Sequence, residues 1–96
     1  MVNPRYKEQI IRIIRQYLPD CTIYLYGSRA RKTNVSGSDI DLALDNGTPI
    51  TDNILAHIRF DIEETTIPLM VDVVDARAID REFYETISKE WVIWKQ

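Results

Sequence analysis

The segment from Thr22 to Asp45 reads TIYLYGSRARKTNVSGSDIDLALD, and its pattern decides the fold expected of this chain. It opens with a β-branched and aromatic run, breaks at Gly27-Ser28, and closes on a strictly alternating stretch over 38–45. Such runs favour strands, and strict alternation is typical of a strand with one buried face. The segment therefore predicts two strands joined by a Gly-Ser turn, a short helix capped by Ser28, and a polar loop.

Helical and extended patterns continue on both sides of this segment. Before it, Asn3-Pro4 is typical of a helix start and Pro19 of a helix end. After it come, in order, a long helix capped by Thr51 or Asp52, a strand over 69–74, a helix marked by Ile79, Phe83 and Ile87, and a short strand over 91–94. This alternation predicts an α/β fold, a small mixed β-sheet flanked by helices, as one domain over residues 1–96.

Length and composition exclude several classes of protein. With 96 residues, 45% of them hydrophobic and 28% charged, the chain is expected to bury one core and no second substrate domain. No apolar run approaches the length of a membrane span, so no membrane association is expected. Cys21 is the single cysteine, which excludes an internal disulfide and favours a small buried residue in a cytoplasmic protein.

The charge is distributed unevenly along the chain. Residues 1–32 carry seven basic and two acidic side chains, whereas residues 33–96 carry five basic and thirteen acidic ones. The first part suits an anion, and the second can hold a cation. The sequence pI near 5.0 and the dispersed basic residues argue against direct binding of nucleic acid.

Two aspartates, Asp39 and Asp41, stand two residues apart in the alternating stretch. Two-residue periodicity places both carboxylates on one face of a strand, and paired carboxylates are the hard oxygen ligands that Mg²⁺ prefers. Asp72, inside a second apolar strand, is a third acid that could face the same site. For an isolated Asp-x-Asp, simple exposure to water would be the better explanation, so the interpretation depends on what lies nearby.

Gly27-Ser28 lies eleven residues before Asp39 and favours a functional site over simple exposure of the aspartates to water. Glycine lets a backbone approach a ligand closely, and a helix that begins here would direct N–H groups toward an anion. Basic residues follow at Arg29, Arg31 and Lys32. A phosphate cradle beside paired carboxylates is the equipment for phosphoryl or nucleotidyl transfer from a nucleoside triphosphate.

The motif Gly27-Ser28-Arg29-Ala30-Arg31, followed by Ser38-Asp39-Ile40-Asp41-Leu42, resembles the signature of the DNA polymerase β-like nucleotidyltransferase superfamily. Nearly the whole chain is similar to the minimal nucleotidyltransferase (MNT) proteins of prokaryotes. Two positions depart from the usual family pattern, because Lys32 and Trp91 stand where glycine is common. Neither departure affects a residue expected to bind metal.

The resemblance implies a set of site residues. Asp39, Asp41 and Asp72 would be the catalytic carboxylates that bind Mg²⁺, and Gly27 and Ser28 would contact the triphosphate. The nucleotide site would also include Arg29 and Ser38. Which basic residue of the Arg29–Lys32 stretch contacts phosphate stays open.

The same resemblance implies an activity and a partner. Minimal members are commonly paired with a helical HEPN-domain toxin, so the chain is expected to act as an antitoxin that transfers AMP from ATP to a tyrosine hydroxyl of that partner. A chain of 96 residues offers little surface for an acceptor, which is in keeping with a hetero-oligomer. The base preference and the acceptor itself stay open.

Two alternatives remain beside this enzyme hypothesis. The chain could be a catalytically weak nucleotide-binding subunit that neutralises or assists a helical partner by binding alone. It could also transfer a nucleotide to a small molecule or to a nucleic-acid end, with a separate subunit binding that acceptor. The intact Asp39-x-Asp41 pair favours the enzyme.

Other polar and aromatic residues receive structural explanations. Asp45 is expected to lead into the Asn46-Gly47 turn, and Asp75 to cap the helix that follows it. His57 is expected on the surface. The aromatic residues near the C-terminus are expected to close the core or to anchor a partner; they are Phe83, Tyr84, Trp91 and Trp94.

Overall fold

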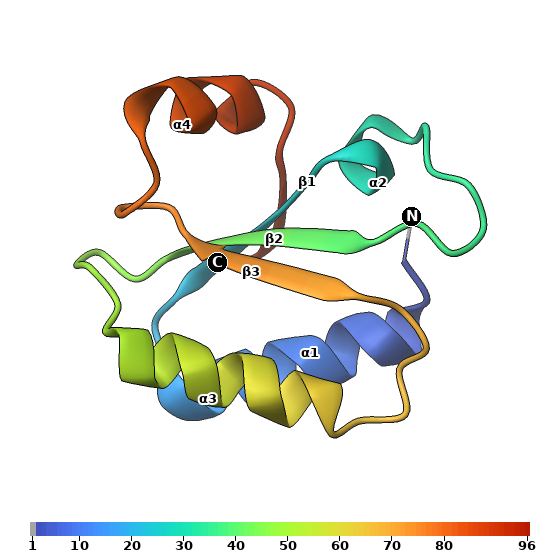
Figure 1. The fold of residues 1–96 in the computed structure, drawn as a ribbon, viewed down its shortest axis with the longest axis horizontal. Coiled ribbons are helices and arrows are strands. Elements are labelled where there is room, and N and C mark those ends of the chain that lie inside the picture. The colour runs from blue at the N-terminus through green and yellow to red at the C-terminus, as the bar shows by residue number, and fades with distance from the viewer. Residues whose placement is uncertain (1) are drawn as a thin grey trace.

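Helices and strands alternate along the chain in the predicted order, and the computed structural model describes them over residues 2–96. The elements are α1 (Pro4–Tyr17), β1 (Thr22–Tyr26), α2 (Ser28–Arg31), β2 (Ile40–Asp45), α3 (Asp52–Glu63), β3 (Val71–Asp75), α4 (Arg81–Ser88) and β4 (Val92–Lys95). The strands form one mixed sheet in the order β3-β2-β1-β4. Within it, β2 and β3 lie side by side (Figure 1). The predicted α/β class, a small mixed sheet flanked by helices, is confirmed.

Side-chain caps explain where the helices begin. The side chain of Asn3 accepts a hydrogen bond from the backbone N–H of Arg5 (2.9 Å), directly before Pro4. Thr51, rather than Asp52, caps α3 by accepting from the backbone N–H of Ile54 (3.3 Å). Each cap satisfies a backbone donor that has no partner inside its helix.

Two capping predictions are wrong. Asp80, and not Asp75, caps α4, and its carboxylate accepts from the backbone N–H of Phe83 (2.9 Å). At α2 the cap position belongs to Gly27, whose φ of 77° is open to glycine at little cost, and Ser28 is the first helical residue.

The sheet combines antiparallel and parallel pairing. β1 runs antiparallel to both β2 and β4, whereas β2 and β3 are parallel and are connected through α3. Parallel neighbours need such a crossover connection, which explains the position of α3 in the sequence. Because β2 lies in the middle of the sheet, its ends are held by strands on both sides.

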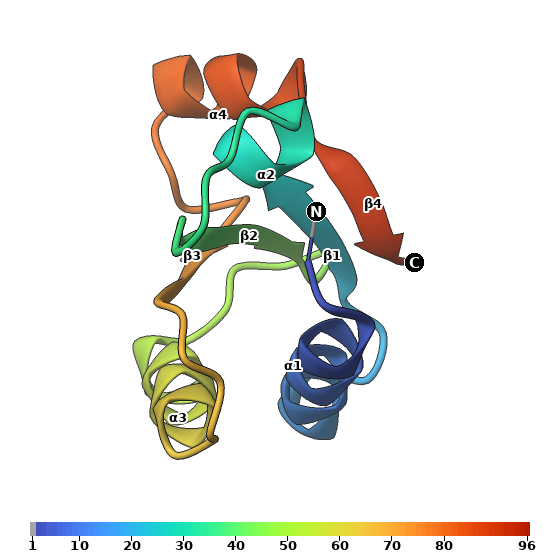
Figure 2. The ribbon, with the colours of Figure 1, turned by 90° about the vertical axis from the view of Figure 1, so that its right-hand side faces the viewer.

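The two faces of the sheet are covered unequally. α1 and α3 lie side by side under one face, and α4 with α2 lies over the other (Figure 2). The larger face buries the predicted alternating residues Ile40, Leu42 and Leu44 completely. The opposite face has a smaller cluster of buried residues around Ala43 and Ile87.

The aromatic residues near the C-terminus divide between the two expected roles. Trp94 is buried in the main core, and Trp91 stacks on Tyr24 with ring centroids 3.9 Å apart. Phe83 and Tyr84 of α4 remain partly exposed. Core closure therefore accounts for the tryptophans but not for Phe83 and Tyr84.

Cys21 and His57 lie where the sequence predicts. Cys21 is buried, and burial raises the pKa of its thiol to about 11. His57 is exposed on α3, with its ring stacked 6.0 Å from that of Tyr17. None of the helices described within residues 2–96 combines the length and apolar character that a membrane crossing requires.

Candidate active site

The turn between β1 and α2 brings backbone directly against a carboxylate. Gly27 has a positive φ, and a Cβ at this position would overlap Oδ2 of Asp41. The Gly27 carbonyl accepts hydrogen bonds from the backbone N–H groups of Ala30 and Arg31, both at 3.1 Å, which close the single turn of α2. The glycine is therefore required for two reasons, its backbone conformation and the space occupied by Asp41.

Asp41 and Asp72 are register partners on the parallel strands β2 and β3. Partners in register lie on the same face of a sheet, so their carboxylates stand side by side. Burial raises the pKa of Asp41, and the negative charges of Asp72 and Asp39 raise it further, whereas the charge of Arg31 lowers it. The structure thus places a second carboxylate beside one that is already partly buried.

Asp39 occupies a different position from the one its spacing predicts. β2 begins at Ile40, whose backbone N–H donates to the Met70 carbonyl (2.8 Å), so Asp39 precedes the strand and is exposed. The predicted strand over 38–45 is two residues too long, because a hydrogen-bonded turn at Val35–Ser38 occupies the chain up to that point. Asp39 is nevertheless close enough to act on the pKa of Asp41.

These residues fit a hard cation in their donor chemistry. Asp39, Asp41 and Asp72 offer only carboxylate oxygens, and the Asp41–Asp72 pair carries charge that a cation would neutralise. Within residues 2–96, however, no three His, Cys, Asp or Glu side chains are grouped tightly enough to count as a metal site. The pair forms the centre of the candidate site, and Asp39 stands at its edge.

The three basic residues after Ser28 differ in what they contact. Arg29 is buried, and its Nε and Nη2 donate to the Ser38 carbonyl at 3.1 and 2.8 Å. Arg31 is about half exposed, forms an ion pair with Glu90 (2.7 Å), and lowers the pKa of Asp41. Lys32 is exposed and ends α2 in the left-handed conformation. Of the three, Arg31 is the basic residue whose charge lowers the pKa of Asp41.

Tyr26 is a residue of this site that sequence reasoning missed. It precedes Gly27 and is the register partner of Asp41 across β1 and β2. The side chain is buried, and burial with the charges of Asp72 and Asp41 raises the pKa of its phenol to about 12. Its position next to the Gly-Ser turn was the available signal, because the last residue of a strand lies at the edge where a site forms.

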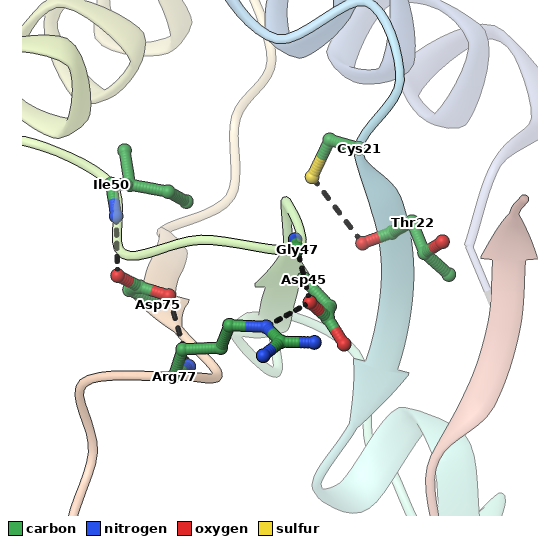
Figure 3. Close-up of polar contacts among 7 residues, drawn as sticks. All are labelled: Cys21, Thr22, Asp45, Gly47, Ile50, Asp75 and Arg77. Atoms are coloured by element: carbon green, nitrogen blue, oxygen red, sulfur yellow. Dashed lines mark hydrogen bonds and ion pairs between the residues drawn. The ribbon is translucent and has the colours of Figure 1, made fainter.

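Asp45 and Asp75 lie at the opposite end of β2 and β3, where donors satisfy them (Figure 3). Asp45 accepts from Nε of Arg77 (2.8 Å) and from the backbone N–H of Gly47 (2.9 Å), which lower its pKa. Asp75 is buried and accepts from the backbone N–H groups of Ile50 (2.8 Å) and Arg77 (2.9 Å). The expectation that Asp45 belongs to the turn therefore holds, and Asp75 holds loops together.

The chain is similar to a known protein family over most of its length. The family model described as "Polymerase beta, Nucleotidyltransferase" matches residues 8–96. The chain belongs to this family. The resemblance drawn from the Gly27-Ser28 and Asp39-x-Asp41 motifs is confirmed, and the family model accounts for nearly the whole chain.

Individual proteins of known name or structure show which members of the family this chain is similar to. A Haemophilus influenzae protein named probable protein adenylyltransferase MntA is 30% identical over 81 residues, covering 84% of this chain and 71% of that protein. A crystal structure of a toxin–antitoxin complex with AMP-PNP matches with a TM-score of 0.77, 22% identity, and coverage of 92% of this chain and 71% of that one. The chain is thus a homologue of MntA within the family.

A second solved structure shares the fold. It contains the tri-AMPylated HEPN toxin of Shewanella oneidensis with its MNT antitoxin, and it matches with a TM-score of 0.72 and 20% identity. The match covers 94% of this chain and 69% of that one. At this identity the likeness establishes the minimal nucleotidyltransferase fold.

Proposed function

We propose that this protein is an Mg²⁺-dependent adenylyltransferase that modifies a hydroxyl group, that of a tyrosine, on a helical HEPN-domain toxin and thereby acts as its antitoxin. The observation that carries the proposal is the carboxylate pair Asp41–Asp72 beside the Gly27 turn. Support also comes from the MntA relative and from the shared fold of MNT antitoxins solved with HEPN toxins.

The residues divide the work of the proposed reaction. Gly27 and Ser28 bring the backbone of the turn close to the triphosphate, with Gly27 leaving room for Asp41. Asp39, Asp41 and Asp72 would hold Mg²⁺, which supplies charge neutralisation for the triphosphate and the leaving pyrophosphate when bound. The positive charge of Arg31 lies near enough to Asp41 to act on the same region.

The transfer itself is an in-line displacement at the α-phosphorus. The acceptor oxygen forms the new P–O bond, the bond to the β-phosphate bridging oxygen breaks, and pyrophosphate leaves. Asp72 is exposed and can take the proton of the acceptor hydroxyl. The partner supplies that hydroxyl, in keeping with a hetero-oligomer.

The test combines the protein with ATP, Mg²⁺ and its HEPN partner. With ATP labelled at the α-phosphate, label should appear on the partner, whereas γ-labelled ATP should give none. The double variant Asp39→Asn, Asp41→Asn should lower transfer at least about a thousandfold, because the charge-neutralising metal is lost. Asp45→Asn is the matched control, since Asp45 lies on the same strand but is bonded to Arg77. Equal labelling by the double variant refutes the catalytic assignment.

The same experiment decides the binding-only alternative. If the double variant still neutralises the toxicity of the partner as well as the unaltered protein does, neutralisation needs binding and no transfer. Label on a nucleic-acid end or a small molecule, with none on the partner, would instead favour the third hypothesis. Replacing the labelled partner tyrosine by phenylalanine should remove the label and identifies the acceptor.

The proposal includes ATP as the donor and a cytoplasmic location. AMP-PNP is present in one of the similar toxin–antitoxin structures. A buried free thiol such as that of Cys21 is also compatible with a reducing compartment.

A further inference from the structure

Asp39 reaches the site from a loop, and that loop is fastened through the residue just before it. The Ser38 backbone N–H donates to the Val35 carbonyl (3.1 Å), and the Ser38 hydroxyl accepts from the Val35 backbone N–H (2.9 Å). The Ser38 carbonyl accepts from Nε and Nη2 of Arg29 at 3.1 and 2.8 Å. Ser38 is thus held by its N–H, its hydroxyl and its carbonyl at once.

The guanidinium of Arg29 is an unusual group to find in this place. The residue is only 7% exposed, although arginine side chains ordinarily keep their charged end in water. Burial of a charged group is costly unless hydrogen bonds replace its water, and a two-donor fork on one carbonyl provides such replacement. The Nε and Nη2 atoms of Arg29 are therefore used in hydrogen bonds to the loop that contains Ser38.

The position of this contact matters because Asp39 lies outside the β2 ladder. Strand pairing orients Asp41, whereas Asp39 precedes the first ladder hydrogen bond, which Ile40 makes. The Ser38 carbonyl and the Asp39 nitrogen belong to one planar peptide group, so fixing that carbonyl fixes the start of Asp39. The Arg29 contact supplies the orientation that strand pairing provides for Asp41.

We infer that Arg29 and Ser38 are positioning residues that orient the Asp39 carboxylate toward the metal site, and that they are not ligands of the triphosphate. The inference rests on the proposed function for the role of Asp39. It replaces the sequence-based expectation that both residues contact the nucleotide. Phosphate contacts are left to the Gly27-Ser28 turn and to Arg31, whose charge acts on Asp41.

The test measures metal binding without turnover. Mn²⁺, followed by electron paramagnetic resonance, serves as the probe, with AMP-PNP present at a saturating concentration. Arg29→Met should weaken Mn²⁺ binding about tenfold, the range found when an outer partner of a metal ligand is removed. Asp39→Asn should weaken it at least as much, and the double variant should be no worse than Asp39→Asn alone, because Arg29 acts through Asp39.

Two further variants should lower Mn²⁺ affinity to different extents, and a third shows whether the loss of affinity is separate from a loss of stability. Arg29→Lys should recover part of the affinity, since an ammonium can donate to the same carbonyl at one point. Ser38→Ala should cost about two- to threefold, because the carbonyl contact remains. Arg15→Met is the matched control, since Arg15 also donates to backbone carbonyls, those of Pro19 (2.8 Å) and Gln96 (2.6 Å), away from the site. It should lower the thermal midpoint of unfolding without changing Mn²⁺ affinity.

Three results would overturn the inference. They are unchanged Mn²⁺ affinity in Arg29→Met, a loss that adds to that of Asp39→Asn, and weaker binding of AMP-PNP in the absence of metal, which is the behaviour of a phosphate ligand. If Arg29→Met does not fold, the ranking of Arg29→Lys and Ser38→Ala decides. Failure of the unaltered protein to label any partner would refute the adenylyltransferase proposal while this binding experiment still reports on Arg29.

Discussion

The two ends of the β2–β3 pair each carry two strand aspartates, and the pairs have opposite surroundings. At one end, Asp45 and Asp75 accept hydrogen bonds from Arg77 and from backbone N–H groups, and the pKa of Asp45 is lowered. At the other end, Asp41 and Asp72 face each other, and the pKa of Asp41 is raised. Within residues 2–96 the structure gives Asp41 and Asp72 no hydrogen-bond donor or ion-pair partner.

This difference separates a structural role from a functional one. A carboxylate whose donors are all within the chain stabilises the folded state, whereas two facing carboxylates without donors destabilise it until a cation arrives. Proteins retain such unfavourable arrangements chiefly at functional sites. The sequence predicts Asp45 as a turn residue and Asp75 as a helix cap, and only the structure shows that the two ends of the strand pair differ in their hydrogen-bond donors.

The largest expected effect comes from replacing Gly27, the glycine beside the Asp41–Asp72 pair, and comparing it with Gly47, the glycine beside Asp45. Gly27→Ala should lower adenylyl transfer about a hundredfold or more, because the new Cβ overlaps Asp41 and the φ of 77° is unfavourable for alanine. Gly47→Ala is the matched control, since its φ is 80° but nothing lies within 4 Å of the added Cβ. Initial rates of label transfer measure the first effect, and denaturant unfolding measures the second.

The control variant separates two effects, the backbone strain of alanine at a positive φ and the displacement of the Asp41 side chain. Gly47→Ala should cost about 1 kcal/mol of unfolding free energy and leave transfer within twofold of the unaltered rate. Equal loss of transfer in the two variants would mean that the position of Asp41 does not matter. That outcome would remove the steric argument for Gly27.

Asp75 tests the structural end of the sheet. Asp75→Ala leaves the buried backbone N–H of Ile50 and the partly buried backbone N–H of Arg77 without their acceptor, so it should lower the free energy of unfolding by about 2–3 kcal/mol. Adenylyl transfer per folded molecule should not change. Urea unfolding and active-site titration of the same preparation check both statements, and a selective loss of activity with full stability would contradict the assignment.

Local sequence signals predict most of this fold. The caps at Asn3 and Thr51, the breaks at Gly27 and Pro19, and the alternation after Ser38 depend on neighbours in sequence, and the elements they predict are present. Periodicity also predicts the burial of Ile40, Leu42 and Leu44, because one face of such a strand must pack against a helix layer, but it does not predict the burial of Ala43 on the other face. These features need no knowledge of tertiary contacts.

The remaining features depend on contacts between distant residues. Asp75 could not be distinguished from a helix cap, because its partner Ile50 lies 25 residues away. Arg29 was expected in the nucleotide site, and its burial depends on the loop that returns to it and places the Ser38 carbonyl against its guanidinium. The start of β2 was placed too early, since the turn at Val35–Ser38 continues the same polar pattern as an exposed strand face. The roles of the site residues remain predictions.

The pH dependence of stability should differ in sign at the two ends. The pKa of Asp45 is lowered on folding, so its contribution to stability is present above the ordinary carboxyl pKa and is lost as the pH falls through the lowered value. The pKa of Asp41 is raised, so stability is greatest when it is protonated and is lost as the pH rises through the raised value.

Asparagine variants measure this difference directly. At neutral pH and without metal, Asp41→Asn should raise the free energy of unfolding by about 0.5–1 kcal/mol, and Asp45→Asn should lower it by a similar amount. The two curves should converge with that of the unaltered protein in acid. Unfolding free energies measured from acid to neutral pH check this, and a loss of stability in Asp41→Asn would show that Asp41 has favourable partners after all.

The smallest expected effect concerns Lys32, where the family often has glycine. Among residues 2–96, Lys32 is the one non-glycine residue with a positive φ, 62°, and it ends α2 in the left-handed conformation that glycine adopts most easily. Lys32→Gly should raise the free energy of unfolding by up to about 1 kcal/mol, reduced by the greater freedom of glycine in the unfolded chain. Lys32→Asn, which also tolerates this conformation, should give a smaller gain, and Lys32→Ala should give none. The exposed Lys32 side chain is not expected to reach the carboxylates, so the rate of adenylyl transfer should be unchanged in all three variants. A lower kcat/KM for ATP in Lys32→Ala would instead assign the charge of Lys32 to the nucleotide site.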